Sequence, residues 1–251
     1  MTKAAELLRL HRDRELLVLV NVWDVASART VAAQPGCRAI ATASAAIAAS
    51  FGYPDGEQIP LERMLDMTAR IVAAVPLPVT ADLEAGYGDV VTTIRRAVAV
   101  GVVGANLEDG LRPLREAATA VTAAVAAADQ EGVPLVLNAR TDAFLLGGGR
   151  EHAVVLADAV ARGLAFLDAG AACVFVPGAV TADDVEALVA ALGDRNVSVL
   201  GLPGLPTPAG LEAAGVARLS YGPYPQRLAL EWLAGQAAAL LAGGPMAVAD
   251  D

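Results

Sequence analysis

Residues 79–88 read VTADLEAGYG, an apolar strand pattern that ends in two carboxylates and then turns on glycines. A helical pattern follows over residues 89–100, and another apolar strand pattern covers residues 103–108. A strand, a helix and a second strand in this order form a parallel β-α-β unit, because two parallel strands need a long crossover connection. The rest of the chain repeats this unit.

Eight apolar, β-branched runs are candidate strands: 16–23, 38–43, 77–83, 103–108, 134–140, 173–177, 197–202 and 217–221. Between them lie stretches with charges at helical spacing, such as 60–75, 89–100, 114–130, 151–169, 181–193 and 207–214. Continuous apolar strands that alternate with helices indicate a parallel sheet covered on both faces. Eight such units in 251 residues match the usual size of a (β/α)8 TIM barrel. We therefore predict an α/β fold with a single barrel domain over residues 1–251, an N-terminal helix and a short loose tail after Gly243.

The composition limits the kinds of partner. Hydrophobic residues make up 55% of the chain, which is enough for one large core. The net charge of −10 argues against a nucleic-acid partner, which needs a basic face. Arg, Asp, Gly or Pro interrupts every long apolar run, and residues 1–14 lack the apolar centre of a signal peptide. We expect a soluble, cytoplasmic protein with no membrane partner.

Scarce residue types exclude several kinds of site. Lys3 is the only lysine and lies in a terminus expected to fray, so a Schiff-base aldolase lacks its essential amine. His11 and His152 are the only histidines, too few for a His-rich zinc site, and both are expected to be solvated. Cys37 and Cys173 begin predicted strands, opposite the usual active-site end of a barrel, and are expected to be buried free thiols. Polar chemistry must come from carboxylates and arginines.

Asp82 and Glu84 are the two carboxylates at the end of the quoted strand. Side chains alternate between the faces of a strand, so these two should point the same way and Leu83 the opposite way. Two acids on one face suit Mg²⁺, which takes a few carboxylate oxygens and keeps several waters. The alternative is a charged strand terminus that pairs with arginines.

Barrel active sites are built from the carboxyl ends of the strands and the loops after them. Other predicted strands end in Asn21, Trp23 and Asp24; in Thr42 and Ser44; in Glu108 and Asp109; and in Asn138, Arg140 and Asp142. The long connection from Ser44 to Pro60 adds Asp55, because excess loop at this end is usually functional. Crowded carboxylates raise each other's pKa values, and a divalent cation resolves that conflict. Arg140 would then be free to grip a substrate carboxylate, unless it neutralises Glu108 or Asp142.

Five segments occur in an order typical of one group of enzymes: NVWDVASAR (21–29), FGYPDG (51–56), ADLEAGYG (81–88), NLED (106–109) and NARTDA (138–143). On these segments the chain resembles the isocitrate lyase/phosphoenolpyruvate mutase superfamily, from about residue 15 to about residue 225. The resemblance implies chemistry at a C–C or P–C bond beside a carboxylate, through an enolate-like pyruvate or related oxyacid.

At matching positions, the resemblance implies a metal site. Asp82 would bind Mg²⁺ directly, with Mn²⁺ as the alternative metal. Asp55, Glu84 and Glu108 would hold the waters of the metal ion. Mg²⁺ and aimed backbone donors would stabilise charge that develops on the substrate oxygen.

The resemblance also implies a substrate site. The backbone of residues 43–45 would bind the oxo and carboxylate end of the substrate, and Arg140 would grip a carboxylate or oxyanion. Arg140 and Asp55 are predicted catalytic residues, with Tyr87 as a candidate proton donor unless it merely packs the turn. The predicted substrate-binding residues are Trp23, Ala43, Ser44, Ala45, Asn138 and Arg140.

The chain departs from the superfamily pattern after Glu108. The lyase branch carries there a mobile loop with a Lys-Lys-Cys-Gly-His motif, whose cysteine is the usual proton donor, and the mutase branch has a longer polar loop. Here residues 108–115 read EDGLRPLR and lead almost at once into a helical pattern. Isocitrate and methylisocitrate are therefore not expected substrates, and a reactive intermediate would be less protected from water.

Three functions remain open. The leading hypothesis is an Mg²⁺-dependent lyase that cleaves a C–C bond of a small oxo- or hydroxy-dicarboxylate, by decarboxylation or retro-aldol cleavage. The second is P–C bond chemistry on a phosphonopyruvate-like compound, with its phosphoryl group against Gly201, Gly204 and Gly222, which are otherwise turn glycines. The third is a non-catalytic barrel that binds an oxyacid.

The superfamily resemblance also implies a homodimer or homotetramer, often formed by exchange of a C-terminal helix. The apolar segment from Gln226 to Leu241, which contains Trp232, is long enough to be that helix. The alternative is that this segment closes its own barrel.

Overall fold

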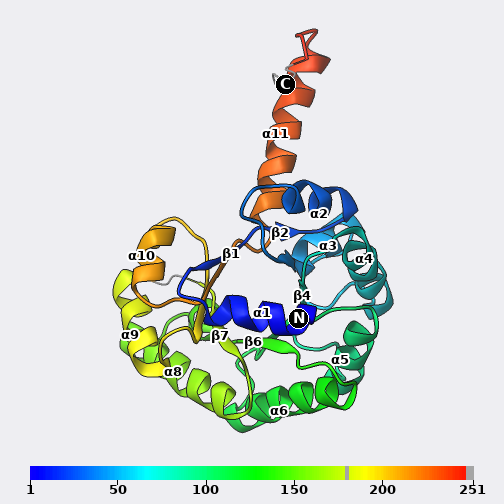
Figure 1. The fold of residues 1–251 in the computed structure, drawn as a ribbon. Coiled ribbons are helices and arrows are strands. Elements are labelled where there is room, and N and C mark those ends of the chain that lie inside the picture. Colours follow the sequence, from blue (N-terminus) through cyan, green and yellow to red (C-terminus); the bar gives the residue numbers. More distant parts are fainter. Residues whose placement is uncertain (179–180, 247–251) are drawn as a thin grey trace.

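Nine parallel strands form one sheet that curves into a barrel with helices around it (Figure 1). This computed structural model describes residues 1–178 and 181–246. The strand order is β1-β9-β8-β7-β6-β5-β4-β3-β2, so from β2 to β9 each strand lies beside the next one in the chain. The predicted (β/α)8 barrel is confirmed.

The first predicted strand is divided in two, and this division closes the ring. Strand β1 (Leu17–Leu19) pairs with β9, and β2 (Asn21–Val22) pairs with β3. The other predicted strands all form, each shorter than its apolar run: β3 (Ile40–Thr42), β4 (Val79–Asp82), β5 (Gly104–Glu108), β6 (Val136–Arg140), β7 (Cys173–Val176), β8 (Val197–Leu200) and β9 (Arg218–Ser220). The apolar runs extend beyond the strands because their outer residues pack in the flanking turns.

The predicted helices form between the strands, and α6 (Leu114–Gln130) has the predicted bounds. The others are α1 (Lys3–Arg12), α4 (Leu61–Ala74), α5 (Val90–Ala99), α8 (His152–Asp168), α9 (Ala182–Leu192), α10 (Pro208–Ala213) and α11 (Tyr224–Leu241). Three helices of the described residues were not predicted: α2 (Val25–Ala32), α3 (Ser44–Ser50) and α7 (Ala143–Leu146). The connection from Ser44 to Pro60 is therefore partly helical rather than a plain loop.

Helix α1 covers the amino-terminal end of the barrel (Figure 1). Its Leu7 and Leu10 are fully buried and share an apolar cluster with residues of β1, β3 and β6. Gly104 makes room for this helix at the start of β5, because a Cβ there would lie 2.5 Å from Leu7 Cδ2. Burial of two leucines contributes about 3–6 kcal/mol to the stability of this end of the barrel. The opposite end stays open.

Two predictions about α1 are wrong. His11 is only 1% exposed, and its Nδ1 lies 2.8 Å from the carbonyl oxygen of Leu7. Lys3 is not frayed, because it begins α1 and its Nζ donates to the carbonyl oxygen of Val75 at 3.4 Å. The sequence showed an arginine- and aspartate-rich helix, and only the tertiary packing reveals that this helix plugs the barrel. Lys3 still lies at the end opposite the cavity described below, so the exclusion of a Schiff-base lysine stands.

Both cysteines are free thiols, as predicted. Cys173 is buried at the start of β7, and burial raises the pKa of its thiol to about 12. Cys37 is only half-buried, because it precedes β3 in a turn rather than lying within the strand.

Helix α11 projects away from the barrel, as the orange segment of Figure 1 shows. None of the helices within residues 1–178 and 181–246 is both long and apolar enough to span a lipid bilayer. The predicted loose tail after Gly243 falls largely on residues 247–251, which lie outside the described residues.

The buried His11 makes the stability of the fold depend on pH. Burial, with the charges of Arg218 and Arg12, lowers its pKa to about 3 from 6.5. The unfolded chain therefore takes up this proton first on acidification, so the contribution is intact above the unfolded pKa and is lost as the pH falls toward 3. The unfolding free energy should fall between about pH 7.5 and pH 5.0, and in His11→Gln this fall should be smaller by roughly 2 kcal/mol. Chemical denaturation at both pH values measures this.

The control for that measurement is His152→Gln, because the His152 side chain is 60% exposed. His152→Gln should change the pH dependence of the unfolding free energy by a different amount from His11→Gln. An acid sensitivity that His11→Gln leaves unchanged contradicts the assignment of a neutral buried imidazole.

Candidate active site

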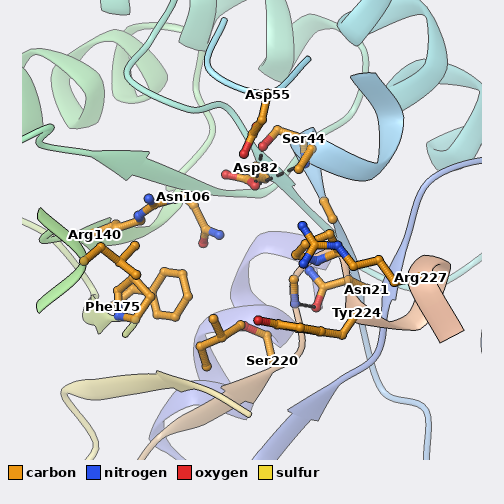
Figure 2. Close-up of a pocket in the computed structure, with 17 residues that line it drawn as sticks. Asn21, Ser44, Asp55, Asp82, Asn106, Arg140, Phe175, Ser220, Tyr224 and Arg227 are labelled. Atoms are coloured by element: carbon orange, nitrogen blue, oxygen red, sulfur yellow. Dashed lines mark hydrogen bonds between the residues drawn. The ribbon is translucent and has the colours of Figure 1, made fainter. Parts of the chain in front are cut away.

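A cavity of about 190 Å³ opens at the carboxyl ends of the strands (Figure 2). Its lining includes one residue from each of six strands: Asn21, Asp82, Asn106, Arg140, Phe175 and Ser220. At roughly 30 Å³ per water molecule, the space holds about six waters, or one small organic acid. The barrel thus presents its cavity where the sequence predicted an active site.

Asp82 is held in a fixed orientation by the start of α3. The backbone N–H of Ser44 donates to Asp82 Oδ2 at 3.1 Å, and the Ser44 hydroxyl donates to the same oxygen at 2.7 Å. The Asp82 backbone N–H donates in turn to Thr42 Oγ1 at 3.0 Å. Within the described residues, Oδ1 has no hydrogen-bond donor. Asp82 lines the cavity, so this second oxygen is available to a ligand.

Asp55 lies beside Ser44 and Asp82 on the same side of the cavity (Figure 2). It comes from the loop that follows α3 and is exposed to solvent. The structure therefore brings together two of the four predicted metal-binding residues as cavity-lining groups.

Glu84 departs from the predicted strand geometry. Strand β4 ends at Asp82, and Glu84 has a left-handed backbone with φ of 52°. Its carboxylate is 3% exposed and accepts hydrogen bonds from the Tyr87 hydroxyl at 2.9 Å and from the backbone N–H of Glu57. Glu84 is not part of the cavity lining. Burial raises its pKa, and the nearby charges of Asp82 and Asp55 add to that increase.

Tyr87 and Glu57 tie the turn after β4 to the loop that carries Asp55. The Glu57 carboxylate accepts from the Tyr87 backbone N–H at 2.5 Å. Tyr87 packs against the apolar cluster that contains Ile47 and does not line the cavity, so the structure supports the packing interpretation rather than the proton donor. Burial and the charge of Glu84 raise the pKa of its hydroxyl, which therefore keeps its proton. Glu57 was not predicted as a site residue, although it lies two residues after Asp55 in the same connection.

Arg140 lines the cavity but is not free of carboxylates. Its Nη1 lies 2.7 Å from Glu108 Oε2, and its Nε lies 2.7 Å from Asp142 Oδ1. The expectation of an uncommitted arginine is wrong, because the pairing left open as the alternative is formed on both sides. Burial raises the pKa of Glu108 to about 8 against the lowering effect of Arg140, and the charges of Asp82, Asp142 and Glu84 raise it further. Arg140 thus contacts two carboxylates, and burial makes Glu108 harder to ionise than an ordinary glutamate.

The predicted substrate residues separate into two groups. Ala43, Ser44 and Ala45 line the cavity. Trp23 instead packs against the cluster that contains Ile47, and Asn138 is fully buried below the cavity, with its Nδ2 donating to Asn106 Oδ1 at 2.9 Å. Neither of these two side chains lines the cavity.

Asp109 also lies outside the cavity, although it follows Glu108 directly. It is 2% exposed and pairs with Arg162 of α8, with 3.0 Å between Oδ2 and Nη1. Its second oxygen accepts from the Asp142 backbone N–H at 3.0 Å. Asp109 thus links the loop after β5 to the loop after β6 and to helix α8.

Comparison with known proteins now adds to this geometry. The sequence model of the family described as phosphoenolpyruvate phosphomutase matches residues 7–241. The chain belongs to this family. It is thus a member of the isocitrate lyase/phosphoenolpyruvate mutase superfamily, as the five ordered segments predicted.

The names of related proteins in this superfamily indicate different reactions. An uncharacterized protein of Mycobacterium tuberculosis (strain H37Rv) is 35% identical over 221 residues, which are 86% of this chain and 81% of the relative. An oxaloacetate decarboxylase of Rhodopseudomonas palustris (strain BisA53) is 31% identical over 154 residues, which are 59% of this chain and 53% of that enzyme.

Two solved structures share the fold closely. A candidate phosphonomutase from Burkholderia cenocepacia J2315 is 43% identical, with a TM-score of 0.86 over 93% of this chain and 98% of that one. A phosphonopyruvate hydrolase in complex with oxalate and Mg²⁺ is 26% identical, with a TM-score of 0.84 over 97% of this chain and 89% of that one. Named members of the superfamily include lyases and mutases, which supports the prediction that this chain is an enzyme.

The donor set of this superfamily member fits a hard divalent cation. Among the described residues, no three Asp, Glu, His or Cys side chains form a cluster that could hold a metal ion. Mg²⁺ does not need such a cage, because it binds one or two carboxylates and keeps several waters. Asp82 offers one unpaired oxygen, and Asp55, Glu84 and Glu108 supply nearby charge. Burial, and to a lesser degree the neighbouring carboxylates, raise the pKa values of Glu84 and Glu108, and a bound cation would favour their charged forms.

The turn after β4 depends on Gly86. This residue has φ of 98°, and a Cβ there would lie 2.6 Å from Val90 Cγ2, whereas Gly88, with φ of 76°, faces open space. In both alanine variants the positive φ strains the backbone, but only Gly86→Ala also places a methyl group too close to a neighbouring side chain. Gly86→Ala should therefore lower the unfolding free energy by about 1–3 kcal/mol more than Gly88→Ala. Urea denaturation of the two variants measures the difference, and equal destabilisation contradicts this description of the turn.

Proposed function

We propose that this protein is an Mg²⁺-dependent carbon–carbon lyase. It cleaves a small oxo- or hydroxy-dicarboxylate, by decarboxylation or retro-aldol cleavage, through an enolpyruvate-like intermediate. The observation that carries this proposal is the orientation of Asp82, with one oxygen bound to Ser44 and the other available to the cavity.

Asp82 would hold the metal directly, and Asp55, Glu84 and Glu108 would hold its waters. Bound there, Mg²⁺, or Mn²⁺ in its place, supplies the positive charge that stabilises an enolate oxygen. The magnesium in the related phosphonopyruvate hydrolase supports this assignment. The raised pKa values of Glu84 and Glu108 support it as well, because burial makes both carboxylates costly to ionise and a bound cation would stabilise their charged forms.

The backbone at the start of α3 would receive the oxo and carboxylate end of the substrate. The Ala43 N–H already donates to the carbonyl oxygen of Val22 at 3.1 Å, and the Ser44 N–H donates to Asp82. Ala45 lines the cavity, and its N–H has no acceptor within the described residues. Of the three predicted residues, Ala45 is therefore the one whose backbone amide is available to a substrate oxygen.

Arg140 would bind a carboxylate or oxyanion of the substrate. Its Nε and Nη1 are engaged by Asp142 and Glu108, and its Nη2 has no carboxylate partner among the described residues. The two ion pairs hold the guanidinium plane still, so Nη2 can face the cavity without a loss of side-chain freedom on binding.

The connection after β5 is short, which favours reactions that do not need a proton donor from a mobile loop over the cavity. Helix α6 begins at Leu114, and Arg112 folds back onto the carbonyl oxygens of Asp109 and Glu108 at 3.0 and 3.1 Å. Arg112 is therefore a loop-fixing residue rather than a group that closes over the cavity. Decarboxylation of an oxaloacetate-like acid needs the enolate site but no cysteine donor, and the similarity to oxaloacetate decarboxylases supports it.

A second candidate function is P–C bond chemistry on a phosphonopyruvate-like compound. The 43% identity to the candidate phosphonomutase favours it. The predicted phosphoryl site is only partly supported, because Gly222 lines the cavity whereas Gly201 packs against Tyr221 and Gly204 faces open space.

The test of the proposed function is a substrate panel with and without Mg²⁺. Pyruvate release from oxo- and hydroxy-dicarboxylates should depend on the metal, and Asp82→Asn should lower the rate at least roughly 100-fold. Asp89→Asn is the matched control, because this exposed carboxylate caps α5 and lies outside the cavity.

Phosphorus NMR of the same protein with phosphonopyruvate tests the second candidate. Metal-dependent binding of these acids without turnover would leave a non-catalytic binding barrel and contradict both enzymatic proposals.

We infer that α11 packs on a second copy of the chain, which would form a homodimer or a homotetramer. The helix leaves the barrel (Figure 1), and Val18 on the outer face of β1 remains 38% exposed. Along α11, Leu228, Trp232 and Leu233 are each more than half exposed. A monomer with these surfaces would place a large apolar patch in water, which soluble monomers rarely do.

The oligomeric state tests this inference. Light scattering after size exclusion should give a mass of at least two chains for the unmodified protein. Trp232→Glu combined with Leu228→Glu should shift the mass toward one chain, whereas Glu231→Gln on the same helix should not. A monomeric unmodified protein contradicts the inference.

We also propose that the protein acts in the cytoplasm on small acids rather than on nucleic acid. Two free thiols fit a reducing compartment, and the charge of −10 repels a phosphate backbone.

A further inference from the structure

A second arginine lines the cavity, on the side opposite Arg140. Arg227 belongs to the first turns of α11, and its guanidinium group extends into the cavity in Figure 2. Asp82 and Asp55 occupy a third side of the cavity between the two arginines. No strand-end motif predicted this residue, because it comes from the last helix.

The two arginines differ in what already binds them. Arg140 is engaged by two carboxylates. Arg227 has no carboxylate within 4.0 Å and no side-chain hydrogen bond among the described residues, and its guanidinium lies over the Tyr224 ring, 5.2 Å from the ring centroid. Stacking on an aromatic face orients a guanidinium but leaves all of its N–H donors available. The cavity therefore contains one positive charge without a fixed counter-ion.

The position of Arg227 relative to Asp82 is fixed, although the rest of α11 projects outward. The neighbouring Gln226 is 6% exposed, and its Nε2 donates to the carbonyl oxygen of Ala46 at 2.8 Å and to Ser50 Oγ at 2.9 Å. Both acceptors belong to α3, whose first residue, Ser44, holds Asp82. One short helix thus sets the places of the carboxylate and of the arginine.

We propose that Arg227 binds a second anionic group of the substrate, a carboxylate at the end remote from the oxo or hydroxy carbon near Asp82. This inference rests on the proposed function and deepens it, because it makes Arg227 the residue that selects dicarboxylates over monocarboxylates. The planar guanidinium can take a carboxylate in a two-pronged hydrogen-bonded pair, which a point charge cannot reproduce. A monocarboxylate of the same length would leave Arg227 without a partner.

Binding of matched ligands to the full-length protein in the presence of Mg²⁺ tests this proposal. Malate and 2-hydroxybutanoate have the same chain length and differ in the distal carboxylate, and 2-oxoglutarate and 2-oxopentanoate form a second such pair. By calorimetry, the unmodified protein should bind the dicarboxylate of a pair about 10–100-fold more tightly than the monocarboxylate. Arg227→Gln should reduce that ratio to about threefold or less, and Arg227→Lys should keep part of it.

Two controls separate a lost subsite from a damaged protein. Oxalate has no distal group to reach Arg227, so its affinity should change less than about twofold in Arg227→Gln. Arg63→Gln should leave every ligand ratio unchanged, because Arg63 also stacks on a tyrosine, 5.6 Å from the Tyr53 ring centroid, but lies outside the cavity.

The outcomes also distinguish this proposal from the proposed function. A dicarboxylate preference that survives Arg227→Gln, or an unmodified protein with no preference, overturns the role of Arg227 even if C–C cleavage is observed. A preference that depends on Arg227, in a protein that cleaves none of the acids, supports the subsite and contradicts the lyase.

Discussion

The two hydrogen bonds from Ser44 to Asp82 are the interaction on which the rest of the site depends. They occupy one carboxylate oxygen and leave the other available to the cavity. They also join β4 to α3, and α3 in turn holds the start of α11 through Gln226. Three walls of the cavity, which lie far apart in the sequence, therefore take their relative positions from one seven-residue helix.

The site concentrates negative charge, while the stability of the fold is built elsewhere. Glu84 and Glu108 are buried carboxylates with raised pKa values, and Arg140 is shared between two acids. The apolar clusters lie around the barrel and at its amino-terminal end, where α1 fills the opening. Buried carboxylates with perturbed pKa values at one end of the barrel, and a closed apolar core at the other, are typical of a functional site.

The sequence predicted the barrel because β-branched runs and helical charge spacing are local signals that parallel β-α-β units repeat. It also located Asp82, Asp55 and Arg140 at the cavity, because strand ends converge in a barrel. It failed where tertiary packing decides. His11 is buried because α1 plugs the barrel, and Glu84 has a left-handed backbone outside the cavity lining because β4 ends at Asp82. Arg227 was not predicted, because it does not lie at a strand end. It reaches the cavity from helix α11, which Gln226 anchors.

The most direct test of the account is the position of a bound metal ion. Crystals grown with Mn²⁺ and oxalate, measured for anomalous scattering, should show a peak in the cavity with Asp82 Oδ1 at about 2.0–2.3 Å and with oxalate oxygens completing its coordination. Asp55, Glu84 and Glu108 should reach this ion through waters rather than directly. A map without a peak beside Asp82, or with the ion bound at another group of residues, contradicts the central claim.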